Sequence, residues 1–194
     1  MKFVESNPAI VKYQGIIISV MAGISIQELT THLESSQVYR AIPNLGCSLN
    51  QGMTVLISAL KTTHANDTVT NDLFSKLGNS LSVNDEKLLD SATALVGGGP
   101  AYTSYFAAAL IEYAITAGFD KASATSITLQ VLRSTCALLE HSKEPPMRLC
   151  ERVMTRGGTT QRAIEFFNHM QLRDTIVEGL KRSCIRSIEL GRRE

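Results

Sequence analysis

The segment 101–117 constrains the fold of this chain most, because its pattern is helical and it is apolar almost all round. Pro100 precedes it, at the first turn, where a helix tolerates proline. Small side chains recur along the segment and let another helix approach closely, namely Ala107, Ala108, Ala109, Ala114 and Ala117. A helix without a polar face must be buried on most sides. The helical part of this chain is too small to cover it alone, so the sequence predicts a homo-oligomer, at least a dimer.

Every element indicated after residue 84 is a helix. The segment 121–141 carries apolar residues on one side and ends before Pro145 and Pro146, which cannot continue a helix. The last segment repeats apolar residues at four-residue spacing from Leu172 to Ile188. We therefore predict an all-helical domain over residues 85–194.

The first 84 residues alternate between strand and helix patterns. Four short runs predict strands, namely 16–20, 38–42, 53–59 and 81–83. Ser25 and Glu28 form a capping box for a helix expected to reach about Glu34, and a second helix is expected over 68–77. Such alternation is typical of an α/β sheet, so residues 1–84 are predicted to form a separate α/β domain.

A turn of glycines and threonines precedes one of the later helices. The sequence Gly157-Gly158-Thr159-Thr160 runs into an apolar-periodic segment that starts at Ala163. Free amides at a helix N-terminus, together with the helix dipole and the threonine hydroxyls, favour a carboxylate or phosphate. The alternative is an ordinary capped helix after a glycine turn, with no ligand.

Charge and composition exclude several classes of partner. Nineteen basic and eighteen acidic residues leave a net charge of +1, which offers no general attraction to nucleic acid or anionic lipid. The opening residues 1–8 carry charged and polar side chains before any apolar run, which fits neither a signal peptide nor a membrane span. We expect a cytoplasmic protein with no membrane partner.

No metal site is predicted. The four cysteines are far apart and show none of the paired spacings of zinc sites or redox dithiols, namely Cys47, Cys136, Cys150 and Cys184. The histidines likewise lack the i, i+4 arrangement with a glutamate. We expect reduced thiols that are mostly packed.

Four segments together resemble the pyrroline-5-carboxylate reductase family of proline biosynthesis, in the same order and spacing, namely 17–23, 39–44, 97–102 and 153–160. The resemblance covers essentially the whole chain. It implies a Rossmann-type dinucleotide-binding domain followed by a helical dimerisation domain. Family members open with a strand and a glycine-rich turn, which this sequence does not contain, so the chain is expected to begin midway through the cofactor domain.

The resemblance also implies a substrate site on the glycine and threonine turn. The substrate carboxylate would be bound at Gly157, Gly158, Thr159 and Thr160, mainly by the backbone amides of the last three. The hydroxyl of Thr160 would lie near the ring nitrogen, and Thr160 is the one residue assigned a catalytic role. Hydride transfer asks mainly for positioning from the protein, so no strong side-chain base is required.

The implied cofactor is NADP or NAD. Its nicotinamide would be lined by residues that follow two strand-like runs, namely Met21, Ala22, Gly23, Pro43 and Asn44. In a dinucleotide-binding sheet the ligand lies at the carboxyl ends of the strands. The alternative is that these residues only form turns.

The sequence departs from the family pattern in several places. Thr155 and Arg156 stand where the family usually has Ser-Pro, and Leu45-Gly46 follows Asn44 where Thr-Pro is common. Gly97-Gly98-Gly99 is interpreted as a hinge that lets two backbones approach. Two functions therefore stay open: a reductase that makes proline, or a non-catalytic remnant that keeps a helical dimerisation module and a carboxylate-binding turn.

Overall fold

The computed structural model of this chain describes Val4 and residues 6–191. Its contacts divide the chain into two compact units, unit 1 with Met1–Pro100 and Glu178–Glu194, and unit 2 with Ala101–Val177. This division differs from the boundary expected after residue 84, because the segment 85–100 and residues 178–191 of the last helix group with unit 1. Residues 1–3 and 5, part of the opening segment interpreted above, and 192–194 lie outside the described residues.

Unit 1 contains a mixed four-stranded sheet. Its strands are β1 (Ile17–Ser19), β2 (Val38–Pro43), β3 (Gly52–Ser58) and β4 (Gly78–Ser82), in the spatial order β1-β2-β3-β4. β1 and β3 run parallel to β2 and β4, respectively, whereas β2 and β3 are antiparallel. The predicted α/β part is confirmed, although β4 begins earlier than the expected run at 81–83.

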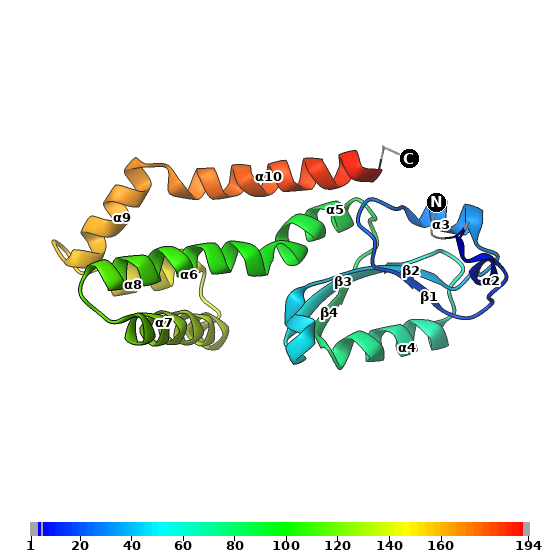
Figure 1. Cartoon of the computed structure of the whole chain (residues 1–194), viewed down its shortest axis with the longest axis horizontal. Helices are drawn as coiled ribbons and strands as arrows, with labels where there is room; N and C mark the ends of the chain where they lie inside the picture. Colours follow the sequence, from blue (N-terminus) through cyan, green and yellow to red (C-terminus); the bar gives the residue numbers. More distant parts are fainter. Residues whose placement is uncertain (1–3, 5, 192–194) are drawn as a thin grey trace. The chain divides into compact units, whose positions relative to one another are not determined.

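Helices cover both faces of this sheet (Figure 1). On one face Phe74 of α4 (His64–Ser75) packs against Ala41 and Leu56. The other face is covered by α3 (Ile26–His32) and α5 (Leu88–Ala92), whose Leu89 joins a buried cluster with Ile42 and neighbouring strand residues. A short helix, α2 (Pro8–Val11), lies near the start of the chain, and its Ile10 and Val11 pack on the cluster around α3.

Local capping sets where these helices begin. The predicted capping box is confirmed: Ser25 Oγ accepts from the Glu28 amide at 3.1 Å, and the Ser25 amide donates to Glu28 Oε2 at 3.0 Å. α4 begins earlier than the expected 68, because Thr63 Oγ1 accepts from the Asn66 amide and so caps the helix at His64.

The triple glycine forms no turn. Residues Thr93–Gly97 form a wide π-helical turn, η2, between α5 and α6 (Gly99–Thr116). Gly98 has φ −79° and ψ −16°, an ordinary right-handed helical conformation. A Cβ on Gly99 would meet nothing within 4 Å, and on Gly97 only Ile42 Cγ2 at 3.9 Å. The close backbone approach expected at this run is therefore absent at Gly97 and Gly99, and Gly98 lies between the end of η2 and the start of α6.

Unit 2 is helical throughout. It contains most of α6, then α7 (Lys121–Ser142), α8 (Pro146–Val153), α9 (Thr159–His169) and the first residues of α10 (Leu172–Gly191). The sequence did not indicate α8, because the two prolines were interpreted only as a stop, whereas Pro146 also starts a helix. In α6 only Ala114 is buried, and most of its larger apolar side chains are exposed, Tyr105 by 79% and Tyr113 by 73%. As predicted, the chain alone does not cover this helix.

Candidate active site

The glycine and threonine turn connects α8 to α9 in unit 2. Gly157 has φ +74°, a left-handed conformation that side chains disfavour, and open space surrounds the place of a Cβ there. Gly158 is extended (φ −78°, ψ 171°) and is the N-cap of α9, with no side-chain cap bond. The two glycines thus reverse the chain and leave the N-terminus of an 11-residue helix open.

The amides of this turn differ in what they already bind. The Gly157 amide donates to Gln161 Oε1 at 2.6 Å, and the Gly158 amide donates to the Thr155 carbonyl at 2.8 Å. Within the described part of the chain, the amides of Thr159 and Thr160 have no hydrogen-bond partner. Of the three amides predicted to bind a carboxylate, two are therefore available and the Gly158 amide is already engaged. Thr160 is half-buried and its hydroxyl likewise donates to no described residue.

The predicted nicotinamide residues lie together at one edge of the sheet in unit 1. Met21, Ala22 and Gly23 follow β1, whereas Pro43 ends β2 and Asn44 follows it. These strands are parallel neighbours, so their carboxyl ends meet at that edge. Ala22 is exposed and Met21 is 36% exposed, so this edge is accessible.

The side chain of Asn44 also stabilises the local backbone. Its Oδ1 accepts from the Gly46 amide at 3.0 Å and from the Met53 amide at 3.3 Å, which holds the short 3-10 helix η1 (Leu45–Leu49) between β2 and β3. This Asx turn explains how Leu45-Gly46 is accommodated where the family commonly has Thr-Pro. Asn44 therefore forms a turn, and its role at a nicotinamide stays a proposal.

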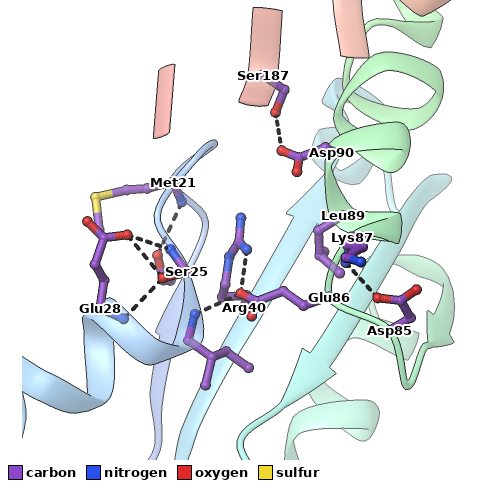
Figure 2. Close-up of polar contacts among 12 residues, drawn as sticks. Met21, Ser25, Glu28, Arg40, Asp85, Glu86, Lys87, Leu89, Asp90 and Ser187 are labelled. Carbon is purple, nitrogen blue, oxygen red and sulfur yellow. Dashed lines mark hydrogen bonds and ion pairs between the residues drawn. The ribbon is translucent and has the colours of Figure 1, made fainter. Parts of the chain in front are cut away.

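An ion pair with a buried arginine, which sequence reasoning missed, lies near the turn that follows β1 (Figure 2). Arg40, in the middle of β2, is 4% exposed, and its Nη1 donates to Glu86 Oε1 at 2.6 Å. The same Glu86 oxygen accepts from the Ile26 amide at 2.7 Å. Arg40 Nε is buried with no partner among the described residues. An arginine inside the apolar run 38–42 could have indicated a buried charge. No local sequence pattern identifies its partner, which is 46 residues away.

The ion pair borders a cavity of about 420 Å³. The turn after β1, the segment 85–90 and the end of α10 surround it, and the guanidinium of Arg40 points toward it (Figure 2). Ser187 of α10 donates to Asp90 Oδ1 at 2.7 Å, which ties the end of α10 to α5. The end of the last helix is therefore part of the surroundings of the predicted nicotinamide loop.

A second buried polar pair lies on the opposite face of the sheet. The hydroxyl of Tyr39 donates to Asp67 Oδ1 at 2.7 Å. Burial raises the pKa of Tyr39 to about 12, and the hydrogen bond and negative charge of Asp67 add to the rise. The pair joins β2 to α4 and is structural.

This pair predicts a specific loss of stability at high pH. The pKa of Tyr39 in the folded chain exceeds the ordinary value of 10.0, so its contribution is complete below pH 10 and is lost as the pH rises towards 12. Tyr39→Phe should lower the free energy of unfolding by about 1 kcal/mol at pH 8 and flatten its decline above pH 10. Urea unfolding of both proteins at pH 8 and pH 11 measures this. An equal decline in both would assign it to other groups.

The described residues contain no group of three or more histidines, cysteines or acidic residues placed to hold a metal ion. The four cysteines are free, and Cys136 is exposed rather than packed. No helix in the described ranges is long and apolar enough to cross a membrane.

A mixed α/β sheet with two loops at the carboxyl ends of the parallel strands β1 and β2, joined to a helical unit whose first helix is uncovered, defines an α/β protein with a helical dimerisation domain. The family model described as pyrroline-5-carboxylate reductase dimerisation matches residues 86–190. The chain belongs to the pyrroline-5-carboxylate reductase family, as the sequence resemblance predicted.

Curated relatives and solved structures agree with this assignment. The chain is 30% identical over 178 residues to the pyrroline-5-carboxylate reductase of Synechocystis, and the match covers 92% of this chain and 66% of that protein. A match to the Aquifex aeolicus enzyme is 27% identical and covers 92% and 67%. The chain thus spans about two thirds of the length of these relatives.

Among solved structures, 1-pyrroline-5-carboxylate reductase from Streptococcus pyogenes superposes with a TM-score of 0.87 at 26% identity, covering 97% of this chain and 73% of that one. Pyrroline carboxylate reductase from Plasmodium falciparum, solved with NADP bound, gives a TM-score of 0.85 at 23% identity over 98% and 73%. The second likeness shows the fold alone. The predicted fold class is confirmed.

Proposed function

We propose that this chain carries the carboxylate turn, the nicotinamide loops and the dimerisation helices of a reductase that converts 1-pyrroline-5-carboxylate to L-proline with NAD(P)H. One observation carries the proposal: the matched region 86–190 contains a helix N-terminus with two free amides and a free threonine hydroxyl at Thr159 and Thr160. Such a group of donors suits the carboxylate that substrate and product share.

The turn would orient the substrate through its carboxylate. The two free amides and the dipole of α9 attract the negative charge, and they are held in place by the bonds that the Gly157 and Gly158 amides make within the turn. The Thr160 hydroxyl would then contact the ring nitrogen, the atom that carries a proton in the product. Arg156, next to the turn, is exposed with its charge close by.

The residues at the sheet edge fit the nicotinamide half of a dinucleotide. Met21 and Ala22 offer an exposed, largely apolar surface, and the Asn44 amide group is beside them at the ends of parallel strands. When bound there, NAD(P)H would supply the hydride that reduces the imine carbon. The chain's own residues position the ring and exclude water from one face of it.

The second candidate is a non-catalytic dimerisation module with a carboxylate-binding turn. It needs only features of unit 2, namely the uncovered helix α6 and the open N-terminus of α9. An assay with pyrroline-5-carboxylate and NADPH, made on this chain joined to the amino-terminal cofactor-binding segment of a relative, separates the two candidates. Substrate-dependent oxidation of NADPH supports the reductase, whereas binding of proline at the turn without turnover supports the module.

We further expect this chain by itself to bind NAD(P)H weakly. Its sequence contains no glycine-rich strand–turn–helix unit of the kind whose amides bind the pyrophosphate. The nicotinamide contacts alone should give a dissociation constant of about 0.1–1 mM, equivalent to roughly 4–5.5 kcal/mol. A fluorescence titration of the reduced cofactor measures it. Binding in the low micromolar range would contradict this expectation.

A further inference from the structure

We propose that Glu86 is a positioning residue for the nicotinamide loop, which we define as residues 20–25, the turn between β1 and α3. The inference rests on the proposed function in one respect, that this loop contacts the nicotinamide. Glu86 itself does not lie at that surface. It acts through the backbone of Ile26, the residue at which the loop ends and α3 begins.

The Glu86 carboxylate joins two elements through a single oxygen. Oε1 accepts from Arg40 Nη1 at 2.6 Å and from the Ile26 amide at 2.7 Å. Arg40 belongs to β2 in the centre of the sheet, whereas Ile26 is the first residue of α3. The bond therefore sets the distance between the end of the nicotinamide loop and the sheet.

Arg40 is what keeps Glu86 in this position. The Glu86 side chain is 33% exposed and could otherwise adopt several rotamers. Arg40 is almost fully buried and Glu86 is its only ionic partner among the described residues, so the pair is held by the cost of leaving a buried charge uncompensated. A rigid strand thus fixes the carboxylate, and the carboxylate fixes the loop.

The capping box cannot perform this task. Ser25 and Glu28 bond to each other within the loop and α3, so they move with the helix and do not attach it to β2. The bond from the Met21 amide to Ser19 Oγ is long, at 3.4 Å. Glu86 therefore connects the end of the loop at Ile26 to Arg40 of β2 through hydrogen bonds.

The middle of the loop lies against the end of α10. Gly23 has φ +79°, and a Cβ on it would be 2.6 Å from the backbone nitrogen of Gly191. A Cβ on Gly191 would likewise meet the backbone of Gly23, with the carbonyl carbon at 3.0 Å. Two glycines thus let the loop and the helix touch directly, so a methyl group at either position must displace the loop.

Amide hydrogen exchange of the full chain, followed by NMR, tests the role of Glu86. In Glu86→Ala the exchange of the Ile26 amide and its loop neighbours should accelerate about tenfold, the effect of losing one hydrogen bond. Glu86→Gln retains an acceptor oxygen and should recover most of the protection. The double variant Arg40→Met/Glu86→Ala has no buried charge, so it should regain global stability while its loop amides still exchange fast.

The double variant shows whether Glu86 positions the loop or only neutralises Arg40. If it restores protection of the loop to the level of the unchanged protein, Glu86 is only the counter-ion of Arg40 and the proposal is wrong. The exchange of Val55 and Leu56, which are buried in β3, reports global stability in the same experiment. Protection that changes equally in β3 and in the loop would also contradict a specific effect on the loop.

A titration with reduced nicotinamide mononucleotide separates this inference from the proposed function. In the unchanged chain, millimolar probe should shift the amide signals of Met21 and Ala22. Gly191→Ala should weaken that response several-fold, because its Cβ collides with the Gly23 backbone. Gly179→Ala, in the same helix, is the matched control, because its Cβ meets nothing within 4 Å. Absence of any shift in the unchanged chain contradicts the nicotinamide assignment, whereas the exchange experiment still decides the role of Glu86.

Discussion

Replacing Ala108 by glutamate is expected to abolish dimerisation while each chain stays folded. Ala108 lies in α6 and is exposed in the single chain, so a glutamate there has water around it until a partner covers the helix. In a dimer that buries this helix, the carboxylate would have no partner, which costs about 3–5 kcal/mol and weakens assembly by more than a hundredfold. Light scattering and analytical ultracentrifugation at micromolar concentration measure the change.

The same experiment needs a control that adds the same charge elsewhere. Gln27→Glu places a carboxylate on α3, at an exposed position in unit 1, and should leave the oligomeric state unchanged. Circular dichroism of both variants checks that they are folded. A monomeric mass for the unchanged chain at micromolar concentration would contradict dimerisation through α6, as would an unaltered dimer for Ala108→Glu.

Loss of the Thr160 hydroxyl should lower kcat/KM by about ten- to hundredfold, the effect of one hydrogen bond to a charged group, roughly 1.5–3 kcal/mol. This hydroxyl has no partner among the described residues, so Thr160→Ala leaves no buried group unpaired and should not disturb α9. The kinetics are measured in a complete enzyme, made by joining this chain to the amino-terminal cofactor-binding segment of a relative.

Two variants make the kinetic result specific. Thr160→Ser keeps the hydroxyl and should recover most of the activity. Thr159→Ala removes the neighbouring, exposed hydroxyl while its backbone amide remains, so its kinetics should change little. Equal rates for Thr160→Ala and the unchanged enzyme would remove Thr160 from the site and leave the turn as a helix cap.

Much of the local structure could be predicted, because it depends on neighbours in the sequence. The capping box of Ser25 and Glu28 and the limits of α6 and α7 follow from residues within one or two turns of each other. The reversal at Gly157 follows from the conformational freedom of glycine. A local rule applied too simply failed at Pro146, which begins α8 as well as ending the preceding pattern.

The residues of the candidate site were predicted from the sequence, but the hydrogen bonds around them were not. Parallel pairing of β1 and β2 brings Met21, Gly23 and Asn44 to one sheet edge, and their role at the nicotinamide stays a proposal. Sequence reasoning did not foresee that the Gly158 amide is already bonded within the turn, because that depends on the exact backbone path. The carboxylate assignment therefore moves to the amides of Thr159 and Thr160 and stays a proposal.

By itself, the sequence determined the family, the α/β and helical parts, and the positions of the turns, because periodicity, capping and glycine placement act over a few residues. Tertiary structure alone decided that Glu86 pairs with Arg40, that Gly191 touches Gly23, and that the end of α10 belongs to unit 1. These contacts join residues tens to more than a hundred positions apart. They form because a buried charge needs a counter-ion and two backbones can touch only where side chains are absent, and no local pattern names the partner.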